Sequence, residues 1–156
     1  MIQVEGLSIP WQQIWPDLIK LLIAFLLALP IGWEREQATR LMGLRTFPIV
    51  AMASCAYVLV SISVIGDSGD ARARIIQGLM SGIGFIGGGA ILKEENTVRG
   101  TATAASVWMT GAVGAAVAFQ RYEIAVITVV FNFLILQFFT PLKEVLSSNE
   151  PEQEEG

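Results

Sequence analysis

Three charged residues follow one another in residues 32–36, Gly-Trp-Glu-Arg-Glu, where a long apolar run ends. On a helix, Glu34 and Glu36 would point about 200° apart, so one of the three charged side chains must face protein or lipid. Charge at a membrane boundary is costly unless it is paired, and Arg45 is an available partner across the connecting loop. Two interpretations stay open: a charge cluster that fixes topology, or an ion-paired gate or cation site. The candidates for this second role are Glu34, Arg35, Glu36, Arg45 and Thr46.

Glu34 is the best candidate for a metal ligand, because a hard cation such as Mg²⁺ takes carboxylate and carbonyl oxygens. No resident cofactor is expected, so Mg²⁺ would be a ligand or a transported ion. The sequence has no histidine and one cysteine, Cys55, which excludes a Cys/His zinc site and any histidine-dependent triad. Ser81 has no histidine base, so an enzyme is the weakest of the function classes.

Six glycines occupy residues 78–89, inside an apolar run from Ile75 to Leu92. Glycine costs a helix about 1 kcal/mol relative to alanine, so this run is not built for helix propensity. One interpretation is a packing face, and its two GxxxG pairs are Gly78 with Gly82 and Gly84 with Gly88. The other is a helix that breaks at a polar site. The spacing predicts that Gly78, Gly82 and Gly84 pack against the following span. For the triplet Gly87, Gly88 and Gly89 two possibilities stay open, a continued helix or an unwound run whose exposed carbonyl groups take part in binding.

The following span offers a polar face. Thr103, Ser106 and Thr110 share one side of a helix, and Trp108 lies among them in sequence. Hydrogen bonds from the hydroxyls to carbonyls four residues earlier would account for them without any function. The alternative is a polar surface that takes part in binding.

Membrane helices are the elements that must position these residues. Hydrophobic residues make up 53% of the chain and charged residues 15%, and the mean hydropathy is +0.59; a soluble domain carries about 25% charge. Most of the apolar stretches approach the ~20 residues that cross a ~30 Å hydrocarbon core. The sequence therefore predicts an all-α integral membrane protein with about five transmembrane helices within residues 17–144. The predicted spans are Leu18–Trp33, Phe47–Ile65, Ile75–Leu92, Ala102–Phe119 and Ile124–Leu142.

Arginine and lysine predict the orientation. Six of them fall on one side of the predicted spans and three on the other, with Lys20 left out because it is expected to reach back towards Asp17. By the positive-inside rule, the N-terminus is outside and the C-terminus cytoplasmic. Residues 1–16 are predicted to form an interfacial segment, and residues 145–156 a disordered acidic tail. No basic stripe is present in the sequence, so nucleic-acid binding is not expected.

Four blocks of sequence carry a family resemblance: GWERE at 32–36, GLRT at 43–46, RIIQGLMSGIGFIGGGAIL at 74–92 and GTATAASVW at 100–108. In this order and at these separations they resemble the signature blocks of the MgtC/SapB membrane proteins. Phe47 and Gly88 depart from the usual family residues, histidine and alanine. Longer members append a soluble cytoplasmic domain, which this sequence is expected to lack.

The resemblance implies a multi-pass protein of the bacterial inner membrane, linked to magnesium limitation and, in pathogens, to virulence. It implies a regulatory role through helix–helix contacts with other membrane proteins, such as the F-type ATP synthase, and the small-residue faces favour a homo-oligomer. The alternative function is transport of Mg²⁺ or another small ion through an oligomer.

Overall fold

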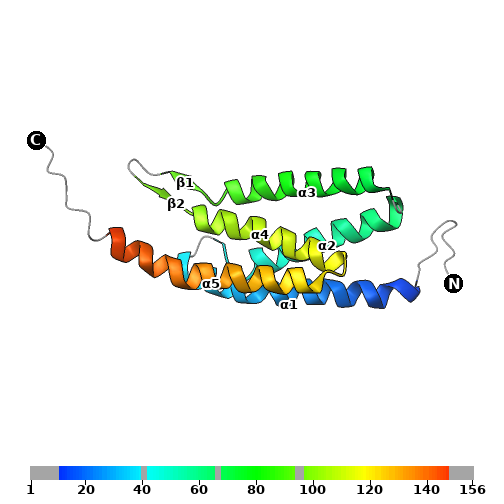
Figure 1. Cartoon of the computed structure of the whole chain (residues 1–156), viewed down its shortest axis with the longest axis horizontal. Coiled ribbons are helices and arrows are strands. Elements are labelled where there is room, and N and C mark those ends of the chain that lie inside the picture. The colour runs from blue at the N-terminus through cyan, green and yellow to red at the C-terminus, as the bar shows by residue number, and fades with distance from the viewer. Residues whose placement is uncertain (1–10, 40–41, 66–67, 94–96, 148–156) are drawn as a thin grey trace, which may run out of the picture.

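The chain forms five helices in a computed structural model, which describes residues 11–39, 42–65, 68–93 and 97–147 (Figure 1). The helices are α1 (Trp11–Thr39), α2 (Thr46–Ile65), α3 (Gly69–Gly88), α4 (Thr101–Ala118) and α5 (Tyr122–Ser147). Two short strands, β1 (Leu92–Lys93) and β2 (Val98–Arg99), pair antiparallel between α3 and α4. The prediction of an all-α protein is confirmed, and the small hairpin was not predicted. Residues 1–10 of the predicted interfacial segment and residues 148–156 of the predicted acidic tail lie outside the described residues.

Helix α4 lies at the centre of the bundle and packs against each of the other four helices. Helix α3 packs against α2 and α4 and runs along one edge, while α1 and α5 lie side by side at the opposite edge (Figure 1). The centre therefore belongs to the helix with many small residues, and the glycine-rich helix is peripheral.

Four of the five helices, α1, α2, α4 and α5, are long and apolar enough to cross a membrane. Helix α3 is the exception, and its bounds explain why. The predicted span began at Ile75, but the helix begins at Gly69 and so includes Asp70, Arg72 and Arg74. It also ends before the apolar residues Ile91 and Leu92, and the second of these belongs to β1. The five predicted spans therefore correspond to the five helices of the described chain, and four of these meet the length and hydropathy expected of a membrane span.

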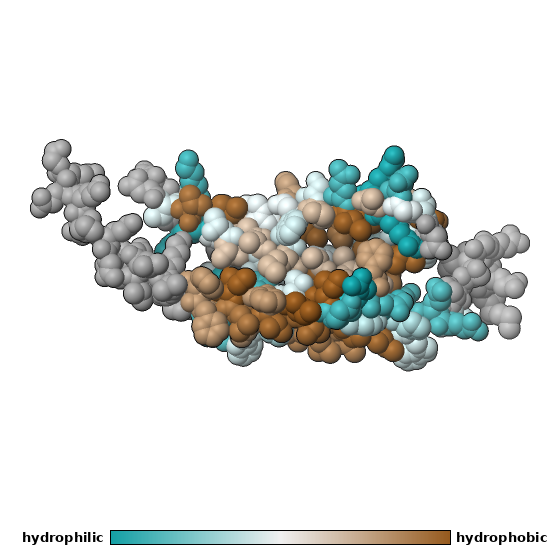
Figure 2. Space-filling view, in the orientation of Figure 1, coloured by the Kyte–Doolittle hydropathy of each residue, from teal (hydrophilic) through white to brown (hydrophobic). Residues whose placement is uncertain are grey.

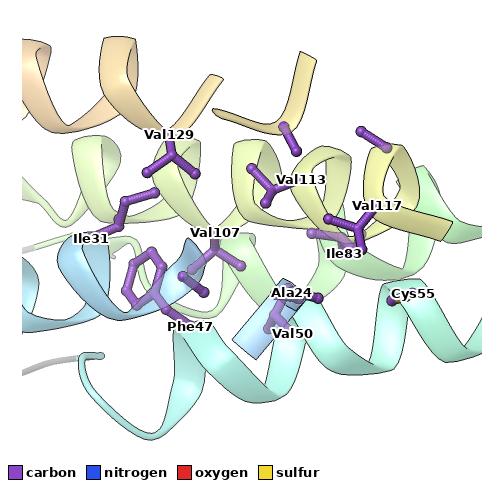
Figure 3. Packing of buried hydrophobic residues seen from close by; sticks show 14 of the residues in the cluster. Ala24, Ile31, Phe47, Val50, Cys55, Ile83, Val107, Val113, Val117 and Val129 are labelled. Carbon is purple, nitrogen blue, oxygen red and sulfur yellow. The ribbon is translucent and has the colours of Figure 1, made fainter. Parts of the chain in front are cut away.

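The core consists of aliphatic and small side chains from all five helices. On α1 the buried residues recur at helical spacing, with Ala24, Ala28 and Ile31 all fully buried. Phe47 of α2 fills the end of the core beside Ile31 (Figure 3). Large apolar side chains also cover the outside of the bundle, most densely along α1 and α5, and Figure 2 shows a paler surface over α3. An outer surface of this kind suits contact with lipid.

The predicted contact of Lys20 with Asp17 is confirmed, with 3.7 Å between Lys20 Nζ and Asp17 Oδ1. Both residues lie near the start of α1, three positions apart on one face. The pair lets the Lys20 ammonium group keep a partner beside the apolar part of the helix.

Candidate functional site

Arg35 is the most deeply buried charged side chain that the structure describes, with 2% of its surface exposed. It continues the buried stripe of α1 that includes Ala28 and Ile31. Its guanidinium group donates twice to the carboxylate of Glu34, from Nε at 2.5 Å and from Nη2 at 2.6 Å. The side chain of Glu34 is itself only 12% exposed. A two-pronged arginine–carboxylate pair of this kind is strong and fixed in orientation.

The loop between α1 and α2 keeps the other charged candidates away from this pair. Glu36 Oε2 accepts a hydrogen bond from the backbone N–H of Leu44 at 3.1 Å, which ties the end of α1 to the loop. Arg45 lies exposed beside the first residue of α2, Thr46, and has no ion pair with a residue that the structure describes. The sequence offered Arg45 as an available partner for the charged cluster, but the structure pairs Glu34 with Arg35, whose long side chain spans the angle between neighbouring positions.

Gly43 holds this loop close to α1. A Cβ atom at Gly43 would lie 2.8 Å from Glu36 Cα, closer than Cβ atoms approach backbone in real structures. The same loop meets Gly32, where a Cβ would lie 3.3 Å from the carbonyl oxygen of Gly43. The sequence blocks GWERE and GLRT therefore form one contact, with glycine on both sides.

Glu34 also lines a pocket of about 370 Å³ between α1 and α5. Its other walls are Trp33, Gln37, Ala38, Phe133 and Gln137. Carboxylate and carboxamide oxygens are suitable ligands for a hard cation. Among the residues that the structure describes, however, no three acidic, histidine or cysteine side chains gather as a metal-binding group.

The glycines of α3 do not pack as predicted. Gly78, Gly82 and Gly84 were expected to contact the fourth span, but a Cβ at any of them would have no described atom of another helix within 4 Å. The physical reason is the direction in which each residue points around the helix. Ile83 and Gly87 form the face of α3 towards α4, and each GxxxG pair points to one side of that face. A Cβ at Gly87 would lie 3.0 Å from the carbonyl oxygen of Ala104, so this glycine alone provides the close approach.

The triplet Gly87, Gly88 and Gly89 ends the helix, without unwinding inside it. The helix continues to Gly88, and Gly89 keeps a right-handed helical conformation. The carbonyl oxygens of Gly87 and Gly88 each accept a hydrogen bond from the backbone N–H three residues later, from Ala90 at 3.0 Å and from Ile91 at 3.1 Å. Those two carbonyls are therefore already hydrogen-bonded by the chain.

The polar side chains of α4 divide into a buried set and an exposed residue. Thr103, Ser106 and Thr110 are buried, whereas Trp108 is 45% exposed on another side of the helix. Thr110 Oγ1 donates to the backbone carbonyl of Ser106 at 2.8 Å, which is the local bond expected of a helical threonine. Ser106 Oγ instead donates across the bundle to Asn132 Oδ1 of α5 at 2.9 Å.

Asn132 was missed by the sequence analysis. It is 2% exposed and is a carboxamide inside the apolar run of α5. A polar residue in the middle of a membrane helix is expensive unless it finds a partner, and that rule would have identified it. The buried polar site of this bundle therefore involves α5 as well as α4.

Comparison of the sequence with known proteins shows its family. The model of the MgtC family matches residues 21–145. The chain belongs to the MgtC family. It is 36% identical to Protein SrpB of Synechococcus elongatus over 138 residues, which cover 81% of this chain and 76% of SrpB. It is 41% identical to Protein MgtC of Brucella abortus over 123 residues, covering 79% of this chain and 51% of the relative. No solved structure gives a significant match.

A further MgtC relative, from Salmonella typhi, is 33% identical over 143 residues, covering 89% of this chain and 61% of its own length. The chain thus spans about half to three fifths of these two MgtC proteins. The sequence resemblance is confirmed, and the chain is a membrane protein of the MgtC type. The glycines of its family blocks have two different settings: Gly43 and Gly87 lie at close contacts within the bundle, and Gly82 and Gly84 face outwards.

Proposed function

We propose that the protein acts in Mg²⁺ homeostasis by regulating another protein of the bacterial inner membrane through helix–helix contacts. The observation that supports this function is the outward surface of α3. Two GxxxG pairs lie on this helix, and at none of their four glycines would a Cβ have a described atom of another element within 4 Å. Exposed glycines of this spacing let a second helix approach closely in lipid.

The two glycine pairs lie on different flanks of α3. Gly78 and Gly82 line a groove of about 700 Å³ between α2 and α3, whose walls are almost entirely apolar. Gly84 and Gly88 lie on the flank away from this groove and are exposed. Because α3 is less apolar than the other four helices, protein covers it more favourably than lipid does.

The family resemblance supplies the partner for this proposal, the F-type ATP synthase, and a second copy of the chain is the other partner that the exposed glycines suit. The proposed orientation places the N-terminus outside and the C-terminus in the cytoplasm, so that the Glu34–Arg35 pair lies at the cytoplasmic side. In this arrangement the Glu34–Arg35 pair and the loop around Gly43 stabilise the contact of α1 with α2, and α2 in turn packs against α3. Neither needs to contact the partner.

The experiment is crosslinking in native membranes, followed by purification and detection of ATP synthase subunits and of tagged second copies. The Gly82→Leu and Gly84→Leu variants each block one flank, and Val126→Leu on the exposed face of α5 is the matched control. We expect one of the two glycine variants to lose the crosslinked partner while keeping the wild-type unfolding temperature, because a Cβ atom at either position meets no described atom outside its own helix. Wild-type protein that captures neither partner, or glycine variants that capture both as well as wild type does, would count against regulation through α3.

The second candidate function is transport of Mg²⁺, and the pocket that Glu34 shares with Gln37 and Gln137 is what favours it. Purified protein in liposomes with an internal Mg²⁺-sensitive dye would then show uptake that Glu34→Gln abolishes. Absence of uptake, beside a working Mg²⁺ channel as positive control, contradicts transport and leaves regulation.

A further inference from the structure

Two polar atoms inside the bundle have no hydrogen-bond partner within the described part of the chain, Thr103 Oγ1 on α4 and Asn132 Nδ2 on α5. Both residues are buried, with exposed fractions of 1% and 2%. A buried polar group without a partner carries the full penalty of losing water, and native structures rarely leave one unpaired. These two atoms need a hydrogen-bond partner that the described part of the chain does not supply.

The position of Thr103 in its helix explains why its hydroxyl group is unpaired. Two of the other buried hydroxyls donate to the carbonyl four residues earlier in their own helix, Ser54 at 2.7 Å and Thr110 at 2.8 Å. Thr103 lies in the first turn of α4, and the residue four positions before it, Arg99, belongs to β2. The usual local acceptor is therefore missing for this one side chain.

The two unpaired atoms belong to residues at or next to one hydrogen bond between α4 and α5. Ser106 Oγ donates to Asn132 Oδ1 at 2.9 Å, and Thr103 precedes Ser106 by three residues on the same face of α4. Side chains three residues apart on a helix have Cβ atoms about 5–6 Å from each other. Thr103 therefore lies one helical turn from the Ser106–Asn132 hydrogen bond, on the face of α4 from which Ser106 reaches α5.

We infer that one buried water molecule binds here and joins α4 to α5. It accepts a hydrogen bond from Asn132 Nδ2 and donates to the hydroxyl oxygens of Thr103 and Ser106. Those three bonds are the number that a buried protein water typically makes. The interface between the two helices then depends on Asn132 through two hydrogen bonds, one direct and one through the water.

The chemistry of the site favours water over an ion. A cation cannot accept the Asn132 N–H, and an anion needs a net positive charge that the core lacks, because the buried Arg35 is already paired with Glu34. Water donates and accepts, so it satisfies Thr103 whichever way round the Asn132 amide is placed. This inference concerns the inside of the bundle and does not depend on the proposed docking through α3.

The test is a structure of the protein in lipid nanodiscs, determined by cryo-electron microscopy with a bound antibody fragment, at a resolution that shows other buried waters. We expect a single density peak within hydrogen-bond distance of Thr103 and Asn132. The peak should vanish in Thr103→Val, which keeps the volume and removes the hydroxyl group, and should persist in Thr103→Ser. Thr110→Val is the matched control, because that hydroxyl bonds only within its own helix, and the peak should persist there too.

Empty density in the wild-type protein would overturn the inference without any variant. A crystal of the protein soaked in bromide gives a second test. Anomalous signal at this position would show that the site binds an anion, which contradicts the inference of water. A peak that survives in Thr103→Val would show that Thr103 is not one of its partners, which also contradicts the bridge.

Discussion

Gly114 of α4 lies directly against the backbone of α2, and we predict that Gly114→Ala separates these two helices. A Cβ at this position would overlap the carbonyl oxygen of Ala51 and would lie 2.9 Å from Ser54 Cβ. Both of these residues are buried, and Ala51 belongs to the middle of a regular helix, so its carbonyl group cannot rotate away. The new methyl group can be accommodated only if the helices move apart.

The matched control is Gly111→Ala, one turn earlier on the same helix. There the Cβ would overlap the far end of Ile83, while the next atom of that side chain, Cγ1, is 3.2 Å away. Ile83 also lines the groove between α2 and α3, so its end can swing into open space. The two substitutions add the same atom, and they differ in whether its neighbour is backbone or a movable side chain.

The magnitudes follow from two opposing effects. Overpacking a buried contact costs about 1–3 kcal/mol, and replacing glycine by alanine in a helix gains up to about 1 kcal/mol. Because the Cβ at Gly114 would meet backbone that cannot move, its overpacking cost should lie at the upper end of that range, and Gly114→Ala should lower the free energy of unfolding by about 2 kcal/mol. Gly111→Ala should leave it close to the wild-type value. Unfolding followed by circular dichroism in one detergent compares them. Equal stability of the two variants, or a Gly114→Ala protein as stable as wild type, would refute the argument from backbone contact.

Three further predictions use the same measurement. Glu34→Gln leaves the buried Arg35 without a counter-charge and should cost about 3–5 kcal/mol, and the Glu34→Gln/Arg35→Met double variant should recover most of it; a double variant as unstable as the single would contradict the buried pair. Gly100→Ala should destabilise the hairpin–helix junction, because Gly100 has a φ of 85° and its Cβ would lie 2.9 Å from the carbonyl carbon of Ala90; unchanged stability would show that this junction relaxes freely. Gly43→Ala should destabilise the α1–α2 contact by about 1–3 kcal/mol, and a neutral result would mean that the loop is not held against α1.

The sequence predicted the helices well where hydrophobicity alone determines them. The apolar runs that contain Ile31, Val58 and Val113 correspond to α1, α2 and α4, because a bilayer helix needs little more than length and apolar composition. The bounds of α3 were less predictable. Charged residues at its start and glycines at its end both lie within the helix, and helix ends depend on hydrogen bonds that hydropathy does not record.

The sequence named several polar residues whose pairings the structure shows, and it did not predict those pairings. Glu34, Arg35 and Ser106 were correctly singled out as polar groups that need partners, but spacing along one helix cannot identify a partner on another helix. Arg35 found its neighbour in sequence, and Ser106 found Asn132, 26 positions away. A long-range pairing of this kind depends on how each helix is rotated about its axis. In a soluble protein an amphipathic pattern would indicate that rotation, but these helices are apolar on nearly every face.

Helices α3 and α4 look alike in sequence, since both are rich in small residues, but the fold uses those residues differently. On α4, Gly111 and Gly114 already face Ile83 and α2, so its small-residue surface is occupied inside the bundle. On α3 the exposed glycines make no close contact with either neighbour, although Gly78 and Gly82 line the groove beside α2, and Gly87 alone makes the close contact with α4. A partner helix that recognises small residues would have to displace α2 or α3 to reach the buried glycines of α4, whereas it can reach Gly82 or Gly84 with the bundle intact. Docking on α3 therefore costs the protein no internal packing, which is why we place the regulatory contact there.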